Sequence, residues 1–176
     1  AEEAREETLR MLHVYEDFQR NYLAIPVIVG RKTEKEKFAG ALETYSLEAM
    51  MYDGVALQNG TSHYFGDGFA KAFGIQYLNK ENKLVTPFQT SWGTTTRMIG
   101  ALIMVHSDDR GLVLPPKIAP FKTVIIPIGN VGETINKLES ELKDKGITYK
   151  VDLSDKTPGY KFADAEVKGY PVRIVV

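Results

Sequence analysis

Hydrophobic residues at the start of the chain recur with the spacing of a helix. They lie at spacings of four and three: Met11, Tyr15, Phe18 and Tyr22. Four glutamates fall within the first seven residues, where the positive end of a helix dipole stabilises negative charge. The pattern predicts an amphipathic helix over Glu2–Asn21.

Short strand patterns separated by polar turns follow this helix. Ile25–Val29 is an apolar run of strand length. Across Ala41–Met51, apolar and polar residues alternate, which is typical of a half-buried strand. Tyr52–Gly54 predicts a turn, and Val55–Gln58 begins another strand.

An Asn59-Gly60 pair then leaves two interpretations open. Taken alone, the pair is a strong hairpin signal. The alternative is a β-bulge, because the polar residues Gln58, Thr61 and His63 cannot all face one side of an unbroken strand.

The remainder of the first hundred residues predicts a sheet with helices against it. The expected elements are a short helix, two strands, a buried helix and a buried strand, at Gly68–Phe73, Ile75–Leu78, Leu84–Gln89, Met98–Val105 and Leu112–Leu114. This order favours an antiparallel sheet in an α+β arrangement.

The pattern changes after the prolines at 115, 116 and 120. Strands and helices then alternate: Val124–Ile128, Gly132–Lys145, Thr148–Leu153, Pro158–Val167 and Val172–Val176. Such alternation predicts an open α/β sheet. We therefore expect two domains, residues 1–119 and 120–176.

Composition narrows the function classes. The 176 residues are 43% hydrophobic and 26% charged, with a net charge of −1. This balance excludes a strongly basic nucleic-acid binder, so any RNA contact must be local. Cysteine is absent, which excludes disulfides and thiolate metal sites within this span. No apolar run reaches the length of a membrane span and the N-terminus is too acidic for a leader, so we expect a cytoplasmic protein.

The stretch Thr90–Pro120 carries the first sign of chemistry. Three threonines are N-cap candidates, and Arg97 follows them in the first turn of the predicted helix. A cation there is disfavoured by roughly 0.3–1 kcal/mol, and an anion bound at the helix start would offset that cost. The alternative is an arginine that snorkels or pairs with a local carboxylate.

Several segments resemble a known family. TSWG, TTR and GLVLPP resemble the third signature motif of class II aminoacyl-tRNA synthetases, in the form found in prolyl-tRNA synthetases. RKTEKEKFAGA and QNGTSH resemble two further segments of these enzymes, and PGYKFADAEVKGYPVR resembles their anticodon-binding domain. No editing insertion fits between the first helix and the third motif, so the chain resembles the archaeal and eukaryotic branch.

The resemblance implies a partial antiparallel catalytic core followed by a partial α/β anticodon-binding domain. It implies a proline–tRNA ligase that activates proline with ATP and Mg²⁺ and transfers it to tRNA(Pro), as a homodimer, with no organic cofactor and no zinc in this span. The implied residues are Arg97 on the γ-phosphate as the catalytic residue, Gln58 and Thr61 on ATP, Phe38, His63, Ser91 and Trp92 around proline, and Phe162 and Glu166 on the anticodon.

For two of these residues, the alternative to a role in binding is a purely structural role. His63 beside Tyr64 could be a satisfied polar residue, and Phe162 could be a core side chain. Phe162 and Glu166 are four apart and hence share a helix face, where an aromatic ring can stack on a base and a carboxylate can accept guanine N–H groups.

The resemblance also sets expectations about the ends of the chain. The family's first and second motifs, with the arginine that grips the α-phosphate, would precede Ala1, and the rest of the anticodon domain would follow Val176. On that basis the chain alone is expected to be nearly inactive in adenylation. The rival interpretations are a non-catalytic synthetase-like module that binds tRNA or protein, and a histidyl-, threonyl- or glycyl-type synthetase.

Overall fold

The computed structural model describes all residues, 1–176, in two compact units, Ala1–Ala101 and Leu102–Val176. One unit has an antiparallel sheet and the other a parallel sheet, which confirms the mixed fold class. The division falls inside helix α3, Arg97–His106. The domain boundary after residue 119 stays a prediction.

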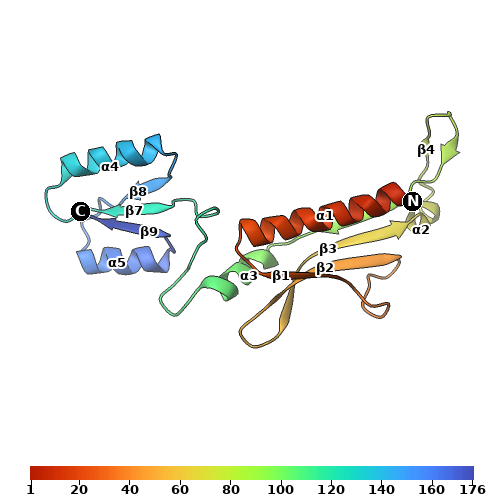
Figure 1. Ribbon diagram of the computed structural model, residues 1–176, viewed down its shortest axis with the longest axis horizontal. Coiled ribbons are helices and arrows are strands. Elements are labelled where there is room, and N and C mark those ends of the chain that lie inside the picture. The colour runs from red at the N-terminus through yellow and green to blue at the C-terminus, as the bar shows by residue number, and fades with distance from the viewer. The chain divides into compact units, whose positions relative to one another are not determined.

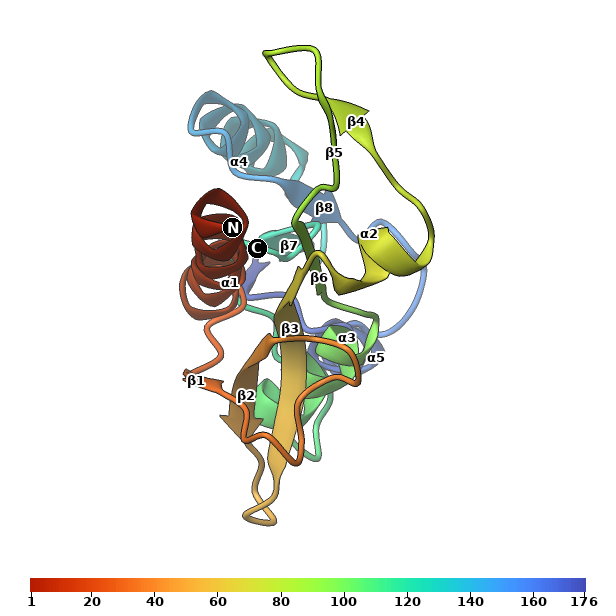
Figure 2. The ribbon, with the colours of Figure 1, turned by 90° about the vertical axis from the view of Figure 1, so that its right-hand side faces the viewer.

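The first unit is a four-stranded antiparallel sheet with a long helix along it. The elements are helix α1 (Glu2–Asn21) and strands β1 (Val27–Arg31), β2 (Glu43–Met50), β3 (Ala56–Gly66) and β6 (Gln89–Gly93), in the order β1-β2-β3-β6. Figures 1 and 2 show α1 lying along one face of the sheet. Leu12 of α1 and Leu47 of β2 are buried in the core. The predicted first helix is confirmed.

Strand β2 differs from the predicted half-buried strand. Leu47 and Ala49 are buried as expected, but the polar residues Thr44 and Ser46 are buried as well, at 2% and 6% exposure. The reason is that β2 lies between β1 and β3, so neighbouring strands flank it on both sides. The Thr44 hydroxyl is also hydrogen-bonded to the Phe38 N–H and to the His63 ring, and these residues shield it from solvent.

The Asn59-Gly60 pair forms a bulge, and the hairpin interpretation is wrong. Strand β3 runs unbroken from Ala56 to Gly66. Its partner register shifts, with Leu47 opposite Gly60 but Glu48 opposite Gln58, so Asn59 is the extra residue. Close packing explains the glycine, since a Cβ on Gly60 would lie 3.1 Å from a Leu47 methyl group.

A short helix and a small hairpin separate β3 from β6. Helix α2 spans Gly68–Ala72, and strands β4 (Tyr77–Leu78) and β5 (Leu84–Val85) pair antiparallel. The predicted strand Leu84–Gln89 is therefore divided. Its start pairs within the hairpin and its end, Gln89, begins β6 against β3.

Two expectations beyond this point need correction. Helix α3 is only partly buried, with Ala101 at 0% but Ile99 at 60% exposure. Residues 112–114 form no strand. Instead the Leu112 N–H donates to the Val167 carbonyl at 3.3 Å, because this segment packs against the end of a helix and not beside a strand.

The second unit is a three-stranded parallel sheet. Its elements are β7 (Thr123–Ile126), α4 (Gly132–Asp144), β8 (Tyr149–Val151), α5 (Pro158–Val167) and β9 (Val172–Val175), with strand order β8-β7-β9. Helices α4 and α5 lie on opposite faces of this sheet (Figure 1). All four residues of the central strand β7 are buried. The predicted alternation of strands and helices is confirmed.

No helix of the chain is long and apolar enough to cross a bilayer.

Candidate functional site

The bulge places three predicted site residues on one face of the first sheet. Glu48 is opposite Gln58 and Ser46 is opposite Thr61. Residues 46 and 48 of the regular strand β2 share a face, so Gln58 and Thr61 share it too, and His63 follows two residues later. Without the extra residue, Gln58 would point to the opposite side.

His63 is fixed at both ring nitrogens. Its Nδ1 lies 2.9 Å from the Thr44 hydroxyl and its Nε2 lies 3.1 Å from the Thr61 hydroxyl. Burial lowers the pKa of His63 below its usual value, and the charge of Lys32 lowers it further. The imidazole is therefore neutral at pH 7, and one nitrogen donates while the other accepts.

An aromatic cluster surrounds this histidine. The rings of Phe38 and Phe65 lie 5.2 and 5.8 Å from the His63 ring, and Phe69 lies 5.0 Å from Phe65. The Phe38 N–H donates to the Thr44 hydroxyl at 3.0 Å, while the Phe38 side chain remains 52% exposed. The arrangement is a polar histidine with an exposed apolar wall beside it, which suits a small amphipathic ligand.

Ser91 and Trp92 lie on opposite faces of the sheet. Ser91 is opposite His63 and shares its face, whereas Trp92 is opposite Ser62. The Ser62 hydroxyl donates to the Thr8 carbonyl of α1 at 2.7 Å, and the Trp92 ring meets Tyr15 of α1 at 6.4 Å. The structure therefore brings Ser91 to the candidate site but turns Trp92 toward α1.

Arg97 begins α3 and reaches back to the bulge. Its Nη1 donates to the Gln58 carbonyl at 3.4 Å, and its backbone N–H donates to the Thr95 hydroxyl at 3.2 Å. No carboxylate forms a salt bridge with it. Gln58, Thr61 and Arg97 line one hollow of about 160 Å³. A guanidinium without a carboxylate partner at the start of a helix suits an anion.

Two residues that contact the site, Thr44 and Lys32, were not predicted from the sequence. Thr44 contacts both Phe38 and His63, and Lys32 forms a salt bridge with Glu48 at 3.6 Å. Strand alternation would place Thr44 on the polar side, but only the register of β2 against β3 brings it opposite His63.

The second unit carries the other predicted pair, at helix α5. Phe162 packs against a buried cluster that includes Val124 and Ala165, and the Arg173 guanidinium carbon lies 4.8 Å from the Phe162 ring centre. The same guanidinium donates to Glu166 Oε1 at 3.3 Å. Phe162 is thus partly a core residue, and Arg173, which the sequence pattern did not indicate, links Phe162 to Glu166.

The structure holds no group of three or more His, Asp or Glu side chains placed to bind a metal ion.

Comparison with known proteins finds close relatives along the whole chain. The family model described as "Anticodon binding domain" matches residues 122–176. The proline–tRNA ligases of Ruminiclostridium cellulolyticum, Lachnoclostridium phytofermentans and Bacteroides fragilis are 62%, 60% and 55% identical to the chain over 99–100% of its length. A crystal structure of prolyl-tRNA synthetase from Cryptosporidium parvum, complexed with L-proline and AMP, superimposes on 99% of the chain with a TM-score of 0.92 and 41% identity.

Over its whole length, the chain is similar in sequence and fold to one part of prolyl-tRNA synthetases. It spans 37% of each of these three proline–tRNA ligases and 39% of the Cryptosporidium chain. The resemblance to prolyl-tRNA synthetases seen in the sequence is confirmed by these matches along the whole chain. The roles of individual residues stay predictions.

Proposed function

We propose that this chain acts as part of a proline–tRNA ligase, which activates proline with ATP and transfers it to tRNA(Pro). The observation that carries the proposal is the 55–62% identity to proline–tRNA ligases along the whole chain. The clustering of Gln58, Thr61, His63 and Arg97 on one face of the first unit supports it.

Arg97, Gln58 and Thr61 form the ATP side of the proposed site. Arg97 neutralises the γ-phosphate, aided by the positive end of the α3 dipole. Gln58 and Thr61 hydrogen-bond the ribose or the adenylate from the bulge. Mg²⁺ accompanies ATP, and because it binds through substrate phosphates with one or two carboxylates, the absence of a three-residue metal cluster is compatible with this role.

Phe38, His63 and Ser91 form the proline side. The exposed Phe38 ring provides an apolar wall for the pyrrolidine, and a neutral His63 lies beside this wall without repelling the charge of the imino group. Ser91 lies beside His63 on the same face. For Trp92 we propose a supporting part, since its packing on Tyr15 holds β6 against α1 from the opposite face.

Phe162 and Glu166 form the anticodon side, within a domain that we place at residues 120–176. A base stacks near Phe162, and Glu166 accepts guanine N–H groups through Oε2, the carboxylate oxygen that Arg173 leaves free. Arg173 orients the carboxylate through Oε1. The match of the anticodon-binding model to residues 122–176 supports this assignment.

No protein nucleophile is needed for this chemistry. The proline carboxylate attacks the α-phosphate of ATP and pyrophosphate leaves. The terminal tRNA hydroxyl then attacks the prolyl carbonyl of the adenylate, and AMP leaves. Positioning and charge neutralisation account for catalysis of such a step. In this proposal the protein works in the cytoplasm as a homodimer.

A titration followed by NMR tests the proposal on the chain itself. A non-hydrolysable prolyl-adenylate analogue should shift the amide signals of Thr61, His63 and Ser91, and a glycyl analogue without the pyrrolidine ring should bind more weakly. The Arg97→Ala variant should instead weaken binding of a non-hydrolysable ATP analogue, because only ATP carries the γ-phosphate that Arg97 is proposed to contact. Equal affinity for the two analogues would contradict the proline assignment, and shifts confined to other regions would contradict the site.

A further inference from the structure

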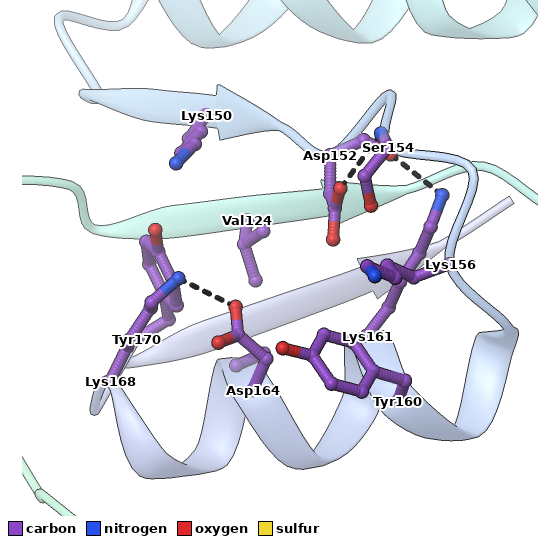
Figure 3. A pocket seen from close by; sticks show the side chains of 11 residues that line it. Val124, Lys150, Asp152, Ser154, Lys156, Tyr160, Lys161, Asp164, Lys168 and Tyr170 are labelled. Carbon is purple, nitrogen blue, oxygen red and sulfur yellow. Dashed lines mark hydrogen bonds and ion pairs between the residues drawn. The ribbon is translucent and has the colours of Figure 1, made fainter.

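The proposed function leaves unused a pocket beside α5 in the second unit. It has a volume of about 260 Å³ and lies between α5 and the end of β8 (Figure 3), and its lining includes the buried residues Val124 and Ala165. Tyr160, Asp164 and Lys168 line it from one row of α5 at intervals of four residues.

This row lies on the opposite flank of α5 from the proposed anticodon residues. Phe162 and Glu166 follow Tyr160 and Asp164 by two positions, which corresponds to about 200° around a helix. The pocket is therefore separate from the surface formed by Phe162, Glu166 and Arg173.

Lysines dominate the polar lining of the pocket. Four lysines and two aspartates line it: Lys150, Lys156, Lys161, Lys168, Asp152 and Asp164.

One lysine of the pocket pairs with a carboxylate, and a second donates to a backbone carbonyl. Lys168 Nζ pairs with Asp164 at 2.7 Å. Lys161 is only 6% exposed, and its Nζ donates to the Asp152 carbonyl at 3.0 Å. Hydrogen bonding from Ser154 lowers the pKa of Asp152, and the charges of Lys161 and Lys150 lower it further, so this carboxylate is ionised at pH 7.

The other two lysines have no carboxylate partner. Neither Lys150 nor Lys156 forms a salt bridge, and both are exposed at the pocket mouth. Lys156 Nζ lies 5.5 Å from the centre of the Tyr160 ring, which favours its position over the pocket through a cation–π interaction. The pocket thus has an excess of two positive charges that an anion would neutralise.

We propose that this pocket binds phosphates of an RNA backbone, with Lys150 and Lys156 as the contacts to the phosphate oxygens. The proposal rests on the proposed tRNA binding. An α-helix is about 10 Å wide, so a strand with one base at Phe162 can place a neighbouring phosphate at the lysine flank of α5. Backbone contacts of this kind position a nucleic acid without reading its sequence.

Binding of labelled RNA to the full 176-residue chain tests the pocket. The probes are a stem-loop carrying the proline anticodon and the same stem-loop with its anticodon guanines replaced by adenines, each followed by fluorescence anisotropy at several salt concentrations. The test variant is Lys150→Ala/Lys156→Ala. The matched control is Lys137→Ala/Lys143→Ala, which removes two exposed lysines from α4 on the other face of the sheet.

Loss of two phosphate contacts should weaken both stem-loops equally, by roughly 10- to 30-fold at 0.1 M salt, and should reduce the slope of log K against log salt by about 1.5. The control variant should bind like the wild type. Glu166→Gln should instead weaken only the stem-loop with guanines.

Three results would overturn the proposal. If Lys150→Ala/Lys156→Ala binds both stem-loops like the wild type, while Glu166→Gln weakens only the stem-loop with guanines, the pocket does not contribute to RNA binding. The proposed function would then still hold. Inorganic phosphate that shifts the Lys150 and Lys156 signals, without any effect of the double variant on RNA, would indicate a site for free phosphate. A wild-type chain that binds neither stem-loop would contradict both the pocket proposal and the proposed function.

Discussion

A buried amide pair ties α1 to the bulge that presents Gln58 and Thr61. Gln19 of α1 and Asn59, the extra residue of the bulge, are 0% and 3% exposed. Asn59 Nδ2 donates to Gln19 Oε1 at 3.0 Å, while Gln19 Nε2 and Asn59 Oδ1 have no partner. A single hydrogen bond therefore serves two buried side-chain amides.

The two partners should show strong coupling in a double-mutant cycle. Gln19→Leu keeps a similar volume but leaves the Asn59 amide without its acceptor, so we expect a loss of about 1–3 kcal/mol in unfolding free energy. Asn59→Leu should cost a similar amount for the same reason. The double variant removes every buried polar atom of the pair, and replacing both partners by apolar groups is nearly neutral, so it should lie within about 1 kcal/mol of the wild type.

Urea unfolding followed by tryptophan fluorescence measures this directly. Trp92 is the single tryptophan of the chain and packs on Tyr15 of α1, so its emission reports the first unit without interference from the second. If the double variant loses as much unfolding free energy as the two single variants together, the two amides contribute independently. That result would contradict the predicted coupling.

Three further predictions concern His63, two glycines and Phe162. Burial and a nearby lysine lower the pKa of His63, so the folded state binds fewer protons than the unfolded state and the free energy of unfolding should fall as pH drops below about 6.5. His63→Gln should flatten this part of the pH profile measured by urea unfolding. An unchanged profile would contradict the prediction. Gly169 has φ +70° and an added Cβ would lie 2.7 Å from Leu112, so Gly169→Ala should destabilise the second unit by at least about 2 kcal/mol, measured by hydrogen exchange of the β7 amides. Gly159 has open space around it, so Gly159→Ala should leave this exchange unchanged. Equal exchange in the two variants would contradict the close packing at Gly169. Phe162→Leu should keep the apolar contact with the core but weaken binding of the proline-anticodon stem-loop by roughly 1–3 kcal/mol; unchanged anisotropy would assign the ring to the core alone.

Periodicity predicted most elements because it records burial along one segment. The helix at Glu2–Asn21 has one apolar face, and the helix at Pro158–Val167 is bounded by Thr157, whose hydroxyl accepts from the Tyr160 N–H, and by proline at its start. Such signals are local and can be read without knowing the neighbours. The strands after residue 120 were found for the same reason.

Pairing between strands could not be predicted in this way. The conflict between Gln58, Thr61 and His63 indicated a bulge, yet only the partner register distinguishes it from a hairpin. The sequence grouped Trp92 with Ser91, although adjacent strand residues point to opposite faces. Arg173 was missed because its contact with Phe162 and Glu166 joins β9 to α5, and no spacing in the chain records that contact.

The most direct test of the proposed ligase role is proline-dependent ATP–pyrophosphate exchange in a chimera. The chain would replace the segment of the Ruminiclostridium cellulolyticum proline–tRNA ligase to which it is 62% identical. We predict that the chimera catalyses exchange within about tenfold of the parent enzyme. Arg97→Ala should lower kcat/KM by about 100-fold or more, and the surface variant Arg10→Ala should not lower it. A chimera that folds like the parent but shows no proline-dependent exchange, or that tolerates Arg97→Ala, would contradict the account.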